Sequence, residues 1–289
     1  MNQATSQTRP EVFNHSLQPI AEVHHAPLTL LQRIYSMSSA RKFAILLLLG
    51  IAWEIYARIL SNPLVFPTFT ATIAALLDGL VSGELPRAAA ATIWLLIQGY
   101  ALGLILAALL TAFASVSRIG ADLLQTLTAM FNPLPSIAML PLAMVWFGLG
   151  DASVIFVLVH AVLWAVALNT FGGFRAVSPT LRLVGQNYGL TGIRYIVRIL
   201  IPGAFASILT GLKVGWAFAW RTLIAAELVF GVSSGSGGLG WYLFEKKNQL
   251  LIVEVFAGLL TIIVFGLLIE NFVFRSVEDR TIRRWGMQN

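Results

Sequence analysis

The sequence contains no cysteine and very little charge. The complete absence of cysteine among 289 residues excludes disulfides, thiolate nucleophiles and cysteine-ligated metals. Only 11% of the residues are charged and 57% are hydrophobic, whereas a soluble domain carries roughly 25% charged residues. So few charges cannot cover a water-exposed surface. We therefore expect the exterior to face another apolar phase, a lipid bilayer.

Several catalytic and cofactor patterns are also missing. The sequence has no G-x-x-x-x-G-K-[ST] phosphate loop and no histidine pair at a metal-ligand spacing. It lacks the clusters of His, Asp or Glu that a membrane-embedded enzyme would need. Gly235, Gly237 and Gly240 form a literal G-x-G-x-x-G, but they follow an apolar run and not a strand. We interpret them as an outer loop, and we expect no cofactor in this chain.

Long apolar runs are the main positive feature. A helix crosses a bilayer with about 20 apolar residues, and six segments qualify: 43–60, 88–113, 123–149, 153–174, 204–232 and 250–274. The third contains Pro133, Pro135 and Pro141, so it is either one kinked helix or a broken one. A shorter helix, too short to span, is predicted from Thr68 or Thr70 to Ser82, at the membrane interface. The fold class is therefore all-α integral membrane, with six transmembrane helices.

Basic residues predict the orientation. If the N-terminus is cytoplasmic, the stretches between spans on that side hold most of the arginines, and the opposite face holds only Arg87, Lys246 and Lys247. Both termini are then inside, and the positive charge serves orientation and not nucleic-acid binding. We expect a mobile N-terminal tail at 1–40 without the marks of a signal peptide, a transmembrane domain at 41–275 and a basic tail at 276–289.

One loop is too polar and basic for its apolar surroundings. Residues 184–202 read VGQNYGLTGIRYIVRILIP and fall on the cytoplasmic side. Drawn as a single helix, the stretch has a polar face and an apolar face. The polar face carries Asn187, Thr191, Arg194 and Arg198. The apolar face carries Ile193, Ile196, Val197 and Leu200. Such a helix either seats on anionic lipid or docks a partner.

The glycine and the closing I-L-I-P of this loop, Gly189 and Ile199 to Pro202, resemble the EAA loop of permease subunits of ATP-binding-cassette importers. Leu183 stands where that family has glutamate, and Ile201 replaces its last leucine. Two further runs resemble the nitrate, sulfonate, taurine and bicarbonate branch: PLPSIAMLPLAMVWFGLGDAS from Pro133 and GWAFAWRTLIAAELVFGVSSGSGGLGW from Gly215. VEDRTIRRW, from Val277, is similar to the basic tail of that branch.

This resemblance implies a type I ABC importer permease-like fold in a bacterial inner membrane, with a cytoplasmic coupling helix in the loop 182–202. It implies partners: two cytoplasmic ATPase subunits that bind ATP and Mg, an outer solute-binding protein, and a second permease copy. A homodimer is the simplest assembly, and a paralogous partner is the alternative. The coupling residues would be Asn187, Gly189, Thr191, Arg194, Arg198 and Pro202. Gly189 would allow a turn or a close approach, and Pro202 would end the helix.

Polar residues inside the apolar runs are candidates for the translocation path, because a buried charge there is costly. Arg221 either lines the path or forms an ion pair, for which Glu227 of the same or the partner subunit is the candidate. A pair within one helix has poor geometry, because residues six apart lie on different faces. His160 either bridges helices or contacts solute, and Asn132 beside the Pro133 break would line the path. The candidate path residues are Arg221, Glu227, Asn132 and His160.

Other polar or small residues in these runs have structural interpretations. Glu54 and Arg58 lie one turn apart and are predicted to pair, and Lys213 is expected to extend to the headgroups. Gly99 and Gly103 predict close helix packing. The alternative function is a self-sufficient secondary transporter or channel. That class favours corresponding halves, which this sequence does not show.

Overall fold

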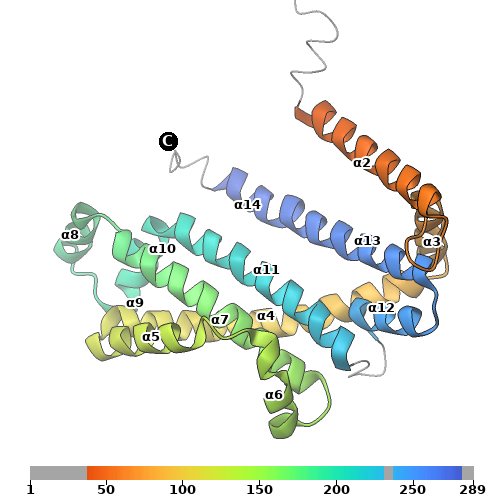
Figure 1. Ribbon diagram of the computed structural model, residues 1–289. Coiled ribbons are helices and arrows are strands. Elements are labelled where there is room, and N and C mark those ends of the chain that lie inside the picture. Colours follow the sequence, from red (N-terminus) through yellow and green to blue (C-terminus); the bar gives the residue numbers. More distant parts are fainter. Residues whose placement is uncertain (1–37, 231–236, 282–289) are drawn as a thin grey trace, which may run out of the picture. The chain divides into compact units, whose positions relative to one another are not determined.

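The computed structural model describes residues 38–230 and 237–281, and every regular element in these ranges is helical (Figure 1). The chain divides into two units, residues 1–51 and 52–289. The first unit contains the beginning of α2 (Ser38–Leu60), whose apolar side chains, such as Phe43 and Leu46, are exposed. Most of the predicted N-terminal tail, residues 1–37, lies outside the described ranges. So do residues 231–236 of the glycine-rich loop and residues 282–289 of the basic tail.

Four helices are long and apolar enough to cross a membrane, and two bent pairs raise the number to six if each pair is one span. The four are α2, α4 (Glu84–Val116), α7 (Asp151–Ala176) and α13 (Ile252–Leu268), which continues through the π-helix η3 (Ile269–Phe274) into α14 (Arg275–Arg280). The bent pairs fall on the third and fifth predicted spans. The helices thus follow the apolar runs of the sequence.

The third predicted span is broken and not merely kinked. It consists of α5 (Arg118–Phe131), the 3-10 helix η1 (Ser136–Met139) and α6 (Leu140–Phe147), and its two arms meet at 88°. Pro133 and Pro135 lie at the break, because neither can donate the hydrogen bond that a continuing helix requires. Pro141 lies in the first turn of α6, where the missing N–H is tolerated.

The helix α7 packs between α4 and α11 (Phe205–Phe230) and forms the centre of the second unit. A Cβ placed on Gly99 would lie 2.6 Å from the Cβ of Leu158, and one on Gly103 would lie 2.7 Å from the Cβ of Val162. The predicted close packing at these two glycines is therefore confirmed, and their partner is α7. Tyr100 of α4 also donates its hydroxyl to the carbonyl oxygen of Leu212 in α11, at 2.9 Å.

The predicted short helix is α3 (Phe69–Val81), and its ends agree with the expectation. Thr68 caps it by accepting a hydrogen bond from the amide of Ala71 at 3.2 Å. The predicted pair of Glu54 and Arg58 is confirmed at 2.7 Å, and Glu54 also accepts from the amide of Thr70 at 3.1 Å.

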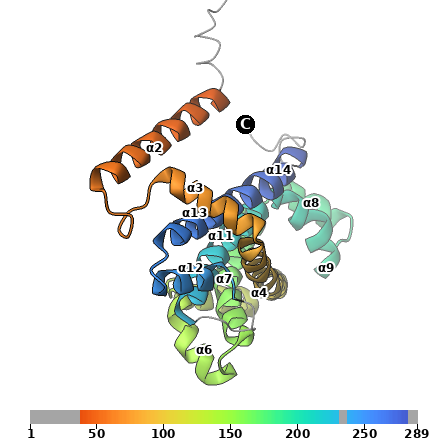
Figure 2. The same ribbon diagram turned by 90° about the vertical axis from the view of Figure 1, so that its right-hand side faces the viewer.

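Two small helical elements lie at opposite ends of α7 and α11 (Figures 1 and 2). At one end is a hairpin formed by α8 (Pro179–Asn187), α9 (Gly192–Tyr195), the π-helix η2 (Ile196–Leu200) and α10 (Ile201–Gly203). At the other end is α12 (Leu239–Asn248). At the hairpin end, Lys213 of α11 forms an ion pair with Glu278 of α14, so it has a partner that its sequence position did not indicate.

Candidate functional site

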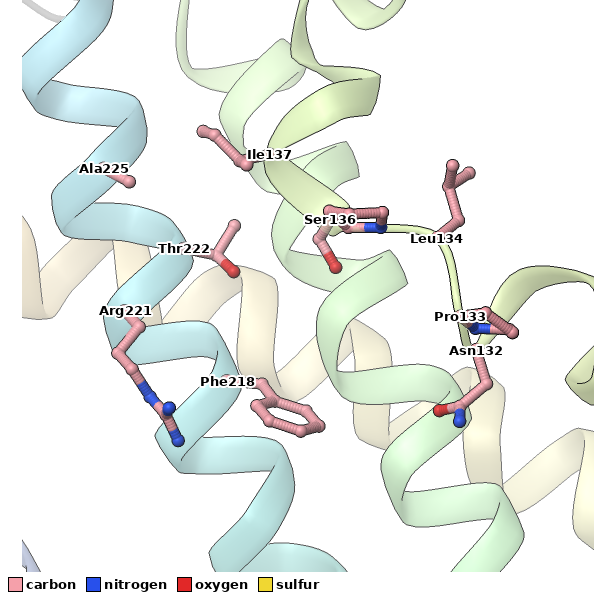
Figure 3. Close-up of a pocket in the computed structure, with 10 residues that line it drawn as sticks. Asn132, Pro133, Leu134, Ser136, Ile137, Phe218, Arg221, Thr222 and Ala225 are labelled. Carbon is pink, nitrogen blue, oxygen red and sulfur yellow. The ribbon is translucent and has the colours of Figure 1, made fainter.

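A pocket of about 330 Å³ lies between the proline break and α11. One wall is the chain from Asn132 to Ile137, and the other is the face of α11 that carries Arg221 (Figure 3). The α11 wall consists of Phe218, Arg221, Thr222 and Ala225. Phe218 and Ala225 are each three or four residues from Arg221 and Thr222, which places the four on one side of the helix.

The break wall is irregular backbone held by the two prolines. Asn132 follows the last residue of α5. Its backbone N–H donates to the carbonyl oxygen of Thr128 at 3.0 Å, and its side chain is exposed. Ser136 begins η1, and its hydroxyl points into the space between the two walls (Figure 3). Thus two predicted path residues, Asn132 and Arg221, line the same pocket from elements nearly ninety positions apart in the chain.

Arg221 supplies the positive charge of the pocket. Its Nε–H donates to the carbonyl oxygen of Ala217 at 3.1 Å, and the guanidinium carbon lies 5.5 Å from the ring centroid of Phe218. The side chain is exposed. No acidic side chain lies within ion-pair distance of Arg221 in the part of the chain that the structure describes.

His160 is not among the residues that line the pocket. Its Nδ1 is 3.1 Å from the hydroxyl oxygen of Ser136, which confirms the predicted hydrogen bond between helical elements. The imidazole is buried beside the rings of Phe131 and Trp164. The Nε2 of His160 and the Nε1 of Trp164 have no hydrogen-bond partner among the described residues. Contact of His160 with a solute remains a prediction.

Glu227 lies outside this pocket. Its carboxylate is buried and accepts hydrogen bonds from the Thr92 hydroxyl and from the amide of Gly240, each at 2.9 Å. The ion pair of Arg221 with Glu227 of the same chain is therefore wrong for the structure described. The reason is that six residues along a helix place two side chains on different faces. An ion pair with a partner subunit stays a prediction.

The loop predicted as one amphipathic helix is two helical segments joined by a turn, so that prediction is wrong. The helix α8 ends in a Schellman motif, with the amide of Leu190 bound to the carbonyl of Gly185 at 3.0 Å and that of Gly189 to Gln186 at 2.8 Å. Gly189 has φ +66° and nothing within 4 Å of an added Cβ. It therefore serves the turn, and no described part of this chain approaches it closely. The helix continues one residue beyond Pro202, and the chain bends by 81° between Gly203 and Phe205.

The exposure of the hairpin side chains agrees with the predicted polar face but only partly with the predicted apolar face. All four predicted polar-face residues are exposed: Asn187, Thr191, Arg194 and Arg198. On the predicted apolar face, Ile196 and Leu200 are buried against Phe174, but Ile193 and Val197 are 74% and 54% exposed. Tyr188, which the sequence did not single out, is 81% exposed. We call Asn187, Tyr188, Thr191, Ile193, Arg194 and Arg198 the hairpin tip.

A second arginine fixes the hairpin to α7. Arg182 donates from Nε to the carbonyl oxygen of Val177 at 3.0 Å and from the guanidinium to the carbonyl oxygen of Phe174. The two segments of the hairpin pack against each other at Gly185, where an added Cβ would lie 2.9 Å from atoms of Tyr195 and Ile199. Sequence reasoning missed both contacts, because they depend on the fold of the hairpin.

The pocket offers hydrogen-bond donors and one cation. Among the residues that the structure describes, no group of three His, Asp or Glu side chains could hold a metal ion. The pocket can bind and orient an anion, and the hairpin tip can contact another protein.

Comparison with known proteins identifies a family. Residues 99–283 match the family model of the binding-protein-dependent transport system inner membrane component. A Methanocaldococcus jannaschii protein named as an ABC transporter permease is 30% identical over 234 residues, which cover 80% of this chain and 86% of that protein. An Escherichia coli protein named for aliphatic sulfonate transport is 31% identical over 204 residues, 71% and 75% of the two chains. The nitrate import permease of Synechocystis is 28% identical over 177 residues, 61% and 60% of the two chains.

Proposed function

The chain belongs to the binding-protein-dependent transport system inner membrane components, in the nitrate, sulfonate and taurine branch of ABC importer permeases, and we propose that the pocket beside Arg221 lines the path of the imported solute. The observation that carries this proposal is the exposed guanidinium on an apolar helix, opposite the proline break.

The cost of burying charge in lipid supports the path assignment. An arginine at the centre of a bilayer costs about 2.5–3.5 kcal/mol on insertion scales. Arg221 makes one hydrogen bond, to its own helix, which does not offset that cost. A water-filled path or a bound anion does.

The lining indicates the chemistry of the solute. The pocket presents one guanidinium and the neutral polar side chains of Asn132, Ser136 and Thr222, and no carboxylate is among its lining residues. Guanidinium binds planar oxyanions with two parallel hydrogen bonds. We therefore assign a small oxyanion, of the nitrate, sulfonate or carboxylate type, to this path.

The hairpin tip is assigned to the contact with ATP-binding subunits. It combines exposed aliphatic and aromatic side chains, Ile193 and Tyr188, with the exposed charge of Arg194 and Arg198. Aromatic residues and arginine are enriched at protein interfaces. ATP and Mg belong to those partner subunits, and no nucleotide site is assigned to this chain.

The assembly follows from the same proposal. Two copies of the permease pair in the inner membrane, with both termini and the hairpin on the cytoplasmic side. A solute-binding protein delivers the oxyanion at the opposite face, where α12 lies. Six spans in one chain make a homodimer the simplest pair.

The test is uptake by the transporter reconstituted in liposomes with its ATPase and solute-binding partners. We expect ATP-dependent uptake of one or more radiolabelled oxyanions from a panel of nitrate, taurine and methanesulfonate. Arg221→Ala should lower that uptake by about 10- to 100-fold, since a hydrogen bond to a charged group contributes about 1.5–3 kcal/mol. Arg118→Ala, which removes an exposed cation at the start of α5, outside the pocket, is the matched control. Unchanged uptake in Arg221→Ala would refute the path assignment.

A further inference from the structure

A buried hydrogen-bond network ties α12 to α4 and α11. Thr92 of α4 accepts a hydrogen bond from the amide of Leu239 at 2.8 Å and donates its hydroxyl to the carboxylate of Glu227, both of whose oxygens lie at 2.9 Å. Glu227 of α11 in turn accepts from the amide of Gly240 at 2.9 Å. The Thr92 and Glu227 side chains are buried, at 0% and 5% exposure. The first amides of a helix have no partner within it, so this network supplies partners for the start of α12.

Two glycines beside the network, Gly238 and Gly240, have no room for a side chain. A Cβ on Gly238 would lie 2.1 Å from a carboxylate oxygen of Glu227. A Cβ on Gly240 would lie 2.5 Å from the carbonyl oxygen of Ile224. The G-x-G-x-x-G run therefore ends in a glycine that lets α12 approach α11, which is a packing role unrelated to nucleotides.

The other end of α12 is also held by α4. Lys246, near its C-terminal end, forms a 2.6 Å ion pair with Glu84 at the start of α4. Between the two attachments, Tyr242 and Leu243 are buried. The helix α12 is thus fixed to α4 at both ends and to α11 at its start.

We propose that Glu227 is a positioning residue, which makes α12 and the Arg221 face of α11 move as one body. This inference rests on the proposed function. Glu227 and Arg221 are six residues apart on one helix, a rise of about 9 Å. The opposite wall of the pocket, the break at Asn132, takes no part in this network. A displacement of α12 is therefore passed through Glu227 to the Arg221 wall, whereas the break wall is attached to α7 by the hydrogen bond between Ser136 and His160.

The first test measures whether α12 and α11 keep a fixed distance during the cycle. Because the chain has no cysteine, Val229→Cys and Lys247→Cys carry spin labels at exposed positions of α11 and α12. In the assembled transporter, the label distance should be the same without nucleotide and with ATP trapped. A distance that differs between these two states would overturn the inference, while an ATPase subunit that does not assemble would contradict the proposed function instead.

The second test removes one hydroxyl. Thr92→Val keeps the shape of the side chain but can neither donate to Glu227 nor accept from the amide of Leu239, and Thr92→Ser keeps the hydroxyl as the control. We expect Thr92→Val to broaden the distribution of label distances and to lower uptake per assembled complex by about tenfold or more. Thr92→Ser should leave both as in the unmodified protein. If Thr92→Val only lowers the melting temperature, with distance and uptake unchanged, Glu227 is structural and the inference is wrong. If Thr92→Val does not assemble, Glu227→Gln is measured in the same way, with the same expectations.

Discussion

Arg182 donates a hydrogen bond from its Nε to the carbonyl oxygen of Val177, at 3.0 Å, just beyond the end of α7. The same guanidinium donates to Phe174 inside the last turn of that helix. The last carbonyl groups of a helix lack partners and carry partial negative charge, so a cation there is favourable. The hairpin is therefore joined to α7 by its first helix and to α11 by the bend after Gly203. The hairpin tip is thus connected to the core through both helices.

Removing the hydrogen bonds of Arg182 to Val177 and Phe174 should uncouple ATP hydrolysis from transport. We expect Arg182→Ala to keep the ATPase subunit bound and hydrolysing, but to lower uptake per ATP several-fold and stability by about 1–2 kcal/mol. The measurement is uptake and phosphate release in the same liposomes. Arg175→Ala, an exposed arginine in the last turn of α7, should change neither. Equal uptake per ATP in Arg182→Ala and the control would show that these hydrogen bonds do not couple ATP hydrolysis to transport.

The turns after α8 and α12 have the same geometry, but one has glycine and the other leucine at the left-handed position. Substitutions at these two positions should therefore change stability in opposite directions. Leu250 follows α12 with φ +59°, in the Schellman position that Gly189 occupies after α8. Left-handed backbone costs an ordinary residue about 1–2 kcal/mol, and glycine is free of this cost. We expect Gly189→Ala to lower the free energy of unfolding by about 1 kcal/mol and Leu250→Gly to raise it by a similar amount. Thermal melting in detergent measures both, and shifts of the same sign in the two variants would contradict the account of these turns.

Charge reversal at the hairpin tip should release the ATPase subunit. We expect Arg194→Glu or Arg198→Glu to lower the amount of ATPase that co-purifies in mild detergent, because each replaces an exposed cation at the contact with an anion. Truncating Tyr188 to alanine should act in the same direction by removing apolar area. Arg118→Glu, an exposed arginine at the start of α5, is the control. Full ATPase recovery in all the tip variants would place the contact elsewhere.

Close packing of α4 on α7 should make Gly99 intolerant of any side chain. Its added Cβ would lie 2.6 Å from the Cβ of Leu158, so Gly99→Ala forces the helices apart at a cost of about 1–3 kcal/mol. Gly172→Ala is the matched control, since nothing lies within 4 Å of its added Cβ and alanine favours a helix. The comparison of the two melting temperatures should show a loss at position 99 only. A Gly99→Ala protein as stable as the control would refute the packing argument.

Local patterns predicted most of the helices. The apolar runs located the spans, Thr68 and Ser82 bounded α3, and Pro133 with Pro135 marked the break, because each of these effects acts within a few residues. Asn132 and Arg221 were identified as path candidates from their polarity inside apolar runs, and the structure brings them to one pocket.

Contacts between distant segments could not be predicted in the same way. The partner of Glu227 is Thr92, 135 positions earlier in the chain, and no local pattern connects the two. The hairpin shows the second limit. A helical wheel assumes one regular α-helix, whereas the segment after the turn passes through the π-helix η2, which buries Ile196, Ile199 and Leu200 and leaves Ile193 and Val197 exposed. The glycines Gly189 and Gly192 within a short polar loop were the available indication of that turn.

The most direct measurement of the path is made with a single cysteine in the pocket. Thr222→Cys introduces the only thiol of a cysteine-free chain, on the α11 wall beside Arg221. We expect an anionic methanethiosulfonate reagent to modify it, to stop ATP-dependent uptake in the reconstituted transporter, and to react more slowly when the transported oxyanion is present. Complete modification, verified by mass spectrometry, with unchanged uptake would contradict the central claim that this pocket is the solute path.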